Sequence, residues 1–156
     1  MRAQELEIKP DGRQSATALA VARGVRRLLR SLGYSTLPEV SLASGRRADL
    51  VGVGADGSIH IVEIKSCVAD FRADQKWPDY RAHCDKLYFA IPQDMPQELL
   101  PLDAGLIVAD AYGAMVLREA PDHRLAPATR RAMLLRFAQV GADRLHDLAD
   151  PERNGL

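Results

Sequence analysis

The chain has few of the features that mark secreted or membrane-spanning proteins. Its 156 residues hold two cysteines, Cys67 and Cys84, whose spacing fits neither a disulfide framework nor a CxxC metal motif. Residues 1–11 are too polar for a signal peptide, and no apolar run approaches the ~20 residues that a transmembrane helix needs. We therefore expect a cytoplasmic protein with no membrane partner.

Net charge is absent as well, because 21 basic and 21 acidic residues cancel. The two signs are nevertheless separated along the chain. Residues 13–47 carry seven arginines and one acid, whereas residues 48–113 carry eleven acids and five bases. A basic third beside an acidic third fits local binding of a polyanion, with a merely solvated helix face as the alternative.

Glycine and proline are near ordinary levels, with 11 and 9 residues, so the chain is neither low-complexity nor collagen-like. Its length predicts a single domain over residues 1–156, with loose termini at 1–14 and 149–156.

The hydrophobic periodicity predicts two long helices. The first is capped by Ser15 and stops at Gly33, and the second begins at Pro127. The apolar face of the second helix comprises Leu134, Phe137, Ala138, Gly141, Leu145 and Leu148.

Between these helices the pattern predicts a sheet. We expect strands at residues 34–42, 48–54, 59–66, 86–91, 105–110 and 114–118, and a short helix opened by Pro78. Pro38 marks its strand as an edge or a bulge. The order of elements predicts an α/β (α+β) fold in which a central mixed β-sheet is flanked by helices.

The hairpin between the second and third strands carries the strongest signal. With residues 55–57 as a three-residue loop, Gly57 takes the left-handed position, and Asp49 then lies opposite Glu63. Lys65, two residues further on, shares the face of Glu63. A two-residue loop would instead shift the register by one and separate the two carboxylates.

Two opposed carboxylates on a buried strand repel each other unless something neutralises them. A divalent cation does so, and carboxylate oxygens suit Mg²⁺ or Mn²⁺. The nearby Lys65 ammonium then orients or activates a water, or stabilises charge on a phosphate. The alternative without a metal is an ion pair, either Lys65 with Glu63 or Arg47 with Asp49.

Asp49, the hairpin and Glu63-Ile64-Lys65 together resemble the signature of PD-(D/E)XK nucleases. That resemblance implies a restriction-endonuclease-like core in which Asp49 and Glu63 hold the metal and Lys65 assists the attacking water. A closer resemblance is to the MmcB family of bacterial DNA-repair proteins, carried by residues 45–51 (GRRADLV), 61–66 (IVEIKS) and 70–80 (DFRADQKWPDY).

The two resemblances imply a metal-dependent nuclease that hydrolyses DNA phosphodiester bonds during repair, with DNA and other DNA-repair proteins as partners. The alternative is a catalytically inactive DNA-binding or adaptor module on the same fold. Basic side chains expected to contact phosphates are Arg23, Arg26, Arg27, Arg30, Arg46 and Arg47.

Three further residues are candidates for the catalytic or DNA-binding site. Glu39 is a candidate additional catalytic acid, with a salt bridge to Arg46 or Arg47 as the alternative. Lys76 and Tyr80 are four residues apart and share a face if they are helical, as in the Q-x-x-x-Y motif of some nucleases, although lysine replaces glutamine here. Both are candidate DNA contacts.

Overall fold

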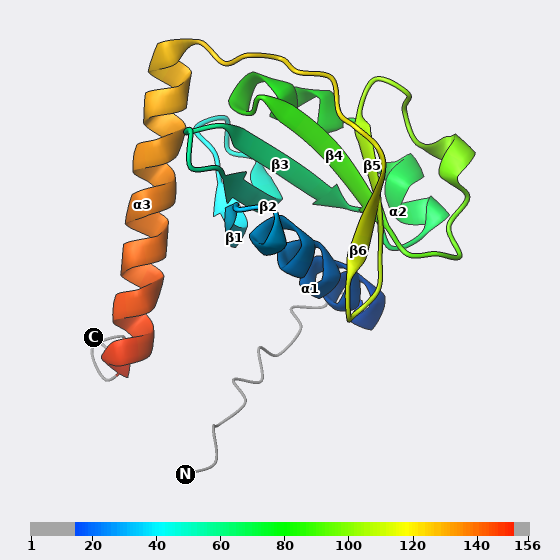
Figure 1. Ribbon diagram of the computed structural model, residues 1–156, viewed down its shortest axis with the longest axis horizontal. Helices are drawn as coiled ribbons and strands as arrows, with labels where there is room; N and C mark the ends of the chain where they lie inside the picture. Colours follow the sequence, from blue (N-terminus) through cyan, green and yellow to red (C-terminus); the bar gives the residue numbers. More distant parts are fainter. Residues whose placement is uncertain (1–14, 152–156) are drawn as a thin grey trace.

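The computed structural model describes residues 15–151 and contains one six-stranded sheet with helices on both faces (Figure 1). Of the predicted loose ends, 1–14 and 149–156, the residues 1–14 and 152–156 lie outside the described part of the chain. Ala149 still belongs to the last helix, so that end was placed slightly too early. The strands are β1 (Ser35–Ser41), β2 (Arg47–Val53), β3 (Ile59–Ile64), β4 (Lys86–Ile91), β5 (Gly105–Ala109) and β6 (Ala114–Arg118). The helices are α1 (Ala16–Ser31), α2 (Val68–Ala73) and α3 (Pro127–Ala149), with two 3₁₀ helices, η1 (Trp77–His83) and η2 (Gln97–Leu99).

The strands lie in the sheet in the order in which they occur along the chain. β1, β2 and β3 form an antiparallel meander, β3, β4 and β5 are parallel, and β6 returns antiparallel to β5. This is the mixed sheet that the sequence predicted, and it is consistent with a restriction-endonuclease-like core. β3 is central and buried on both faces, as its nearly continuous apolar sequence required.

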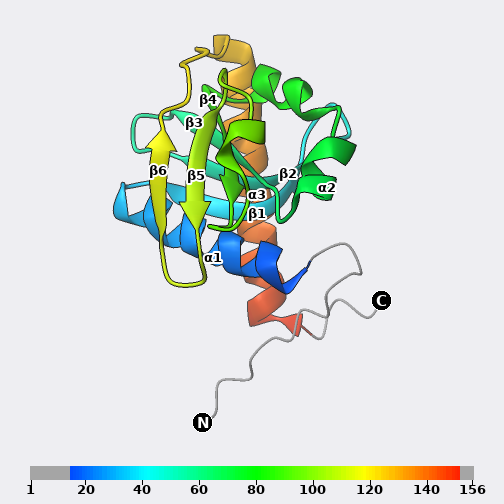
Figure 2. The same cartoon turned by 90° about the vertical axis from the view of Figure 1, so that its right-hand side faces the viewer.

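Helix α1 covers one face of this sheet through Val25 and Leu29, which pack against Leu50, Val62 and Ile107 of the strands. The other face is covered by η1 and the beginning of α3 (Figures 1 and 2). Ser15 caps α1 as predicted, since its hydroxyl oxygen accepts the amide hydrogen of Ala18 over 3.1 Å. The predicted stop also holds, because Gly33 adopts a φ of +88°.

A buried ion pair fastens α3 to the sheet. The Asp85 carboxylate accepts hydrogen bonds from both terminal nitrogens of Arg130, at 2.6 and 2.7 Å, and from the backbone amides of Ile59 and Leu125. Only the first half of the apolar face predicted for α3 packs against the core. The second half does not, because α3 extends past the β1 edge of the sheet (Figure 1). Leu145 and Leu148 are exposed.

Two local features differ from the sequence analysis. Helix α2 lies in a segment for which no element was predicted, and its N-cap is Cys67, whose sulfur accepts the amide hydrogen of Asp70 in place of the usual hydroxyl or carboxylate oxygen. The helix expected at Pro78 is the 3₁₀ helix η1. The edge position of Pro38 is confirmed, since β1 is the outermost strand. Within residues 15–151, no helix is both long and apolar enough to cross a membrane.

Candidate metal centre and its basic groove

The hairpin register places Asp49 beside Glu63, as the loop length predicted. β2 and β3 pair Leu50 with Val62 and Val53 with Ile59, so the next pair along the ladder is Asp49 and Glu63. The turn is closed by hydrogen bonds from the amides of Gly54 and Gly57, and Gly57 has the expected left-handed φ of +81°. The chemistry of the turn thus fixes which carboxylates meet.

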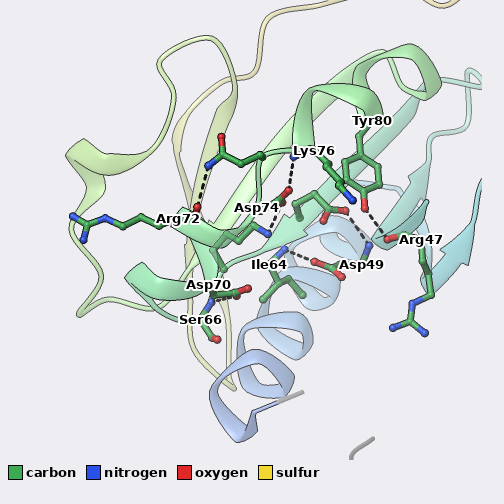
Figure 3. Close-up of polar contacts among 12 residues, drawn as sticks. Arg47, Asp49, Ile64, Ser66, Asp70, Arg72, Asp74, Lys76 and Tyr80 are labelled. Atoms are coloured by element: carbon green, nitrogen blue, oxygen red, sulfur yellow. Dashed lines mark hydrogen bonds and ion pairs between the residues drawn. The ribbon is translucent and has the colours of Figure 1, made fainter. Parts of the chain in front are cut away.

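At the pair formed by Asp49 and Glu63, side-chain carboxylates accept the hydrogen bonds of backbone amides. The Asp49 amide donates to Glu63 Oε1 over 3.1 Å, and the Ile64 amide donates to Asp49 Oδ2 over 2.8 Å. Figure 3 shows the Asp49 carboxylate directed toward Ile64. Each carboxylate is therefore fixed by the backbone of the opposite strand, which holds the two acids in a defined orientation.

Both acids occupy an environment that disfavours their charge. Glu63 is only 3% exposed, and its pKa is raised well above 4.5, first by burial and then by the neighbouring Asp49. Burial also raises the pKa of Asp49, against the opposing effect of the hydrogen bond from Ile64. Two carboxylates with raised pKa values on one patch form a site that an added cation would stabilise.

The simple ion pairs that would neutralise this patch are not formed. Lys65 is buried, and its Nζ donates to Asp74 Oδ2 over 2.6 Å instead of pairing with Glu63. Arg47 lies 3.9 Å from Glu39 rather than pairing with Asp49. Within residues 15–151 the two acids thus have backbone hydrogen bonds but no salt bridge within 4.0 Å.

Asp74 is a site residue that the sequence reasoning missed. Burial lowers the pKa of Lys65, but the hydrogen bond to Asp74 outweighs it and the net pKa is raised, so the lysine stays charged. The second Asp74 oxygen accepts the Lys76 amide over 2.9 Å, which orients the carboxylate (Figure 3). Asp74 follows Lys65 by nine residues, across α2, and no periodicity in the sequence indicates that contact.

Glu39 lies opposite Asp49 in the pairing of β1 with β2. Its φ of +49° is in the left-handed region, and its carboxylate lies 3.9 Å from the Arg47 guanidinium, which is the salt-bridge alternative. Among the described residues, no group of three or more His, Cys, Asp or Glu side chains is arranged to hold a metal. The donor set at the hairpin therefore consists of two protein carboxylates.

An arginine-lined groove includes one of these acids. It lies between α1 and β1, has a volume of about 670 Å³, and includes Asp49, but not Glu63, in its lining. Its basic side chains are Arg23, Arg26, Arg27 and Arg30. The structure thus brings four of the six predicted arginines into the groove that Asp49 lines.

The other predicted DNA contacts do not line this groove. Arg46 pairs with Asp79 at 3.1 Å, and neither Arg46 nor Arg47 lines the groove. Lys76 is exposed at the N-cap of η1, a 3₁₀ helix rather than the α-helix that a shared face with Tyr80 assumed. Tyr80 is 8% exposed and its hydroxyl donates to the Arg47 carbonyl over 3.0 Å (Figure 3), so this placement supports the site and does not present a surface for DNA.

Comparison with known proteins identifies the family. The family model described as DNA repair protein MmcB-like matches residues 5–152, and the chain belongs to this family, which is associated with DNA repair. The fold is similar to a solved structure described as the SPO1766 protein of unknown function from Silicibacter pomeroyi. The two share 43% identity, the match covers 89% of this chain and 95% of that one, and the TM-score is 0.86. No curated protein matches the chain.

Proposed function

We propose that the protein is a metal-dependent DNA nuclease of the PD-(D/E)XK type. The observation that carries the proposal is the pair formed by the partly buried Asp49 and the buried Glu63, which form no salt bridge within residues 15–151, with Asp49 lining a groove that also holds four arginines. Because the chain belongs to a DNA-repair family, DNA is the polyanion that we expect the arginines to bind.

The residues present fit a hard divalent cation. Carboxylate oxygens are the donors that Mg²⁺ and Mn²⁺ prefer, and Mg²⁺ is commonly held by one or two carboxylates with water completing its shell. Asp49 and Glu63 would hold the ion, which would supply Lewis-acid polarisation of a phosphate and a more acidic water. Binding of the ion would also stabilise the protein, because the positive charge would reduce the repulsion between the two carboxylates.

The chain's own residues supply the remaining requirements of hydrolysis. The oxygen of a water bonds to phosphorus and that water gives up a proton to solvent, while the bond from phosphorus to the leaving sugar oxygen breaks and the leaving oxygen takes a proton from solvent. Lys65, kept charged by Asp74, orients the water and stabilises the extra negative charge on the phosphate. The α1 arginines hold the neighbouring phosphates of the strand.

The test is a cleavage assay on single-stranded, duplex, flapped and four-way DNA with Mg²⁺, Mn²⁺ or chelator. We expect metal-dependent cutting by the wild type, lost in Glu63→Gln and in Lys65→Ala. Glu98→Gln, an exposed acid on η2, is the matched control and should cut normally. Cutting that persists in Glu63→Gln would contradict the proposal.

A catalytically inactive DNA-binding module is the second candidate. It is favoured by the donor set, because the described residues provide two carboxylates and no cluster of three potential ligands. The two candidates differ in their dependence on metal. A binding module holds DNA equally well with chelator and cuts no substrate, whereas Asp49→Asn in a nuclease abolishes cutting and leaves DNA affinity in chelator unchanged.

A further inference from the structure

We propose that the groove between α1 and β1 takes single-stranded DNA in preference to duplex, with one base stacked on Tyr34. The inference rests on the proposed function, since it assigns a substrate class to the same site. It is carried by an aromatic surface in the groove, a row of arginines, and the depth of the acids.

The aromatic surface is Tyr34, which precedes β1 and lines the groove. Its ring centroid lies 4.4 Å from that of His60, and His60 lies 5.7 Å from Tyr88. The two inner rings are buried, whereas Tyr34 is only partly buried. Tyr34 is thus a partly exposed ring that is supported by His60 and lines the groove, and an unpaired base can stack on such a ring.

The arginines run along the same groove. Arg23, Arg26, Arg27 and Arg30 repeat at helical spacing on α1, so the first and last are about 10 Å apart along the helix axis. Arg26 is fixed across the groove by its hydrogen bond to Thr36 on β1. Arg23 and Arg30 form no polar contact with any other described residue, so both are available to phosphates. A cationic track beside an aromatic platform is typical of proteins that bind single strands.

Tyr34 and the acids mark two ends of this track. Glu39, which lines the groove beside Asp49, lies five residues along β1 from Tyr34, a separation of about 16 Å for an extended strand. A strand that passes Asp49 can therefore follow the arginines of α1 to Tyr34.

The depth of the acids disfavours duplex. Glu63 is nearly inaccessible and Asp49 is partly buried, so the scissile phosphate must enter the groove to reach them. A single strand bends freely and turns its bases toward the wall. Duplex DNA is stiff, with a persistence length of about 150 base pairs, and keeps its bases paired away from Tyr34.

The experiment is fluorescence anisotropy with a labelled oligothymidine and a labelled blunt duplex of equal length, both in chelator. We expect the wild type to bind the single strand at least about 10-fold more tightly than the duplex. Tyr34→Leu should weaken single-strand binding by about 5- to 150-fold, the range that loss of one stacked base produces, and Tyr34→Phe should retain it. Arg131→Gln removes an exposed arginine on α3, outside the groove, and should leave binding unchanged.

Duplex binding as tight as single-strand binding, unchanged single-strand affinity in folded Tyr34→Leu, or no binding of either DNA would overturn the inference. The wild-type comparison decides the preference even if Tyr34→Leu does not fold. Chelator prevents metal-dependent cutting, so the outcome is separate from the proposed function. Single-strand preference without cleavage contradicts the nuclease alone, and duplex preference with cleavage contradicts this inference alone.

Discussion

Replacing Glu63 with glutamine should stabilise the metal-free protein at neutral or alkaline pH. Glu63→Gln keeps the shape of the side chain and a carbonyl oxygen that can accept the Asp49 amide hydrogen, while it removes a buried charge beside another carboxylate. Relief of buried, uncompensated charge is worth on the order of 1–3 kcal/mol. In a chain of this length that gain raises Tm by roughly 2–12 °C.

The sign of this effect depends on pH. Because the folded-state pKa of Glu63 is raised above its ordinary 4.5, the wild type loses stability relative to Glu63→Gln as pH rises through that raised pKa. Below about pH 4.5 the acid is protonated in both the folded and the unfolded chain, so the difference vanishes. Thermal denaturation in chelator at several pH values measures it, with Glu98→Gln as control. A Glu63→Gln protein that is no more stable than the wild type at pH 8 would refute the reasoning.

Three further predictions concern residues that hold the fold or the site. Asp85→Asn should cost about 2–3 kcal/mol at pH 7, because the hydrogen bonds from Arg130 and two amides outweigh burial and lower the Asp85 pKa from 3.8 to about 2. That stability is present above pH 4 and is lost between about pH 4 and 2, so an equal acid sensitivity in the variant would contradict it. Gly24→Ala should lower Tm markedly, since its Cβ would lie 2.1 and 2.4 Å from backbone carbonyl oxygens of the β5–β6 turn; an unchanged Tm would be inconsistent with this packing. Asp74→Asn should slow cleavage by about 10²-fold through misplacement of Lys65 and leave DNA affinity in chelator intact, whereas a parallel loss of affinity would point to a structural defect.

The part of the site that local chemistry determines was predictable from the sequence. The loop at residues 55–57 sets the β2–β3 register, and the register alone brings Asp49 to Glu63. The spacing of α1 likewise predicts a row of arginines on the side that the core leaves free. In both cases the deciding interactions join residues close together in the chain.

What depends on tertiary packing was not predictable. The contact between Lys65 and Asp74 requires α2 to turn the chain back across the end of β3. The N-cap of α2 is a cysteine, which is not one of the usual capping residues, so the sequence did not indicate where this helix begins. Tyr80 was a candidate DNA contact, yet η1 buries it against the core. Along α3 the apolar period continues past the edge of the sheet, so periodicity alone could not indicate where packing ends.

A titration of the protein with Mn²⁺, followed by the EPR signal of the free ion, tests the proposed metal centre most directly. We expect one Mn²⁺ site in the wild type that is lost in both Asp49→Asn and Glu63→Gln and retained in Glu98→Gln. Absence of binding to the wild type, or a site that survives both substitutions, would contradict the claim that Asp49 and Glu63 form a divalent-metal centre.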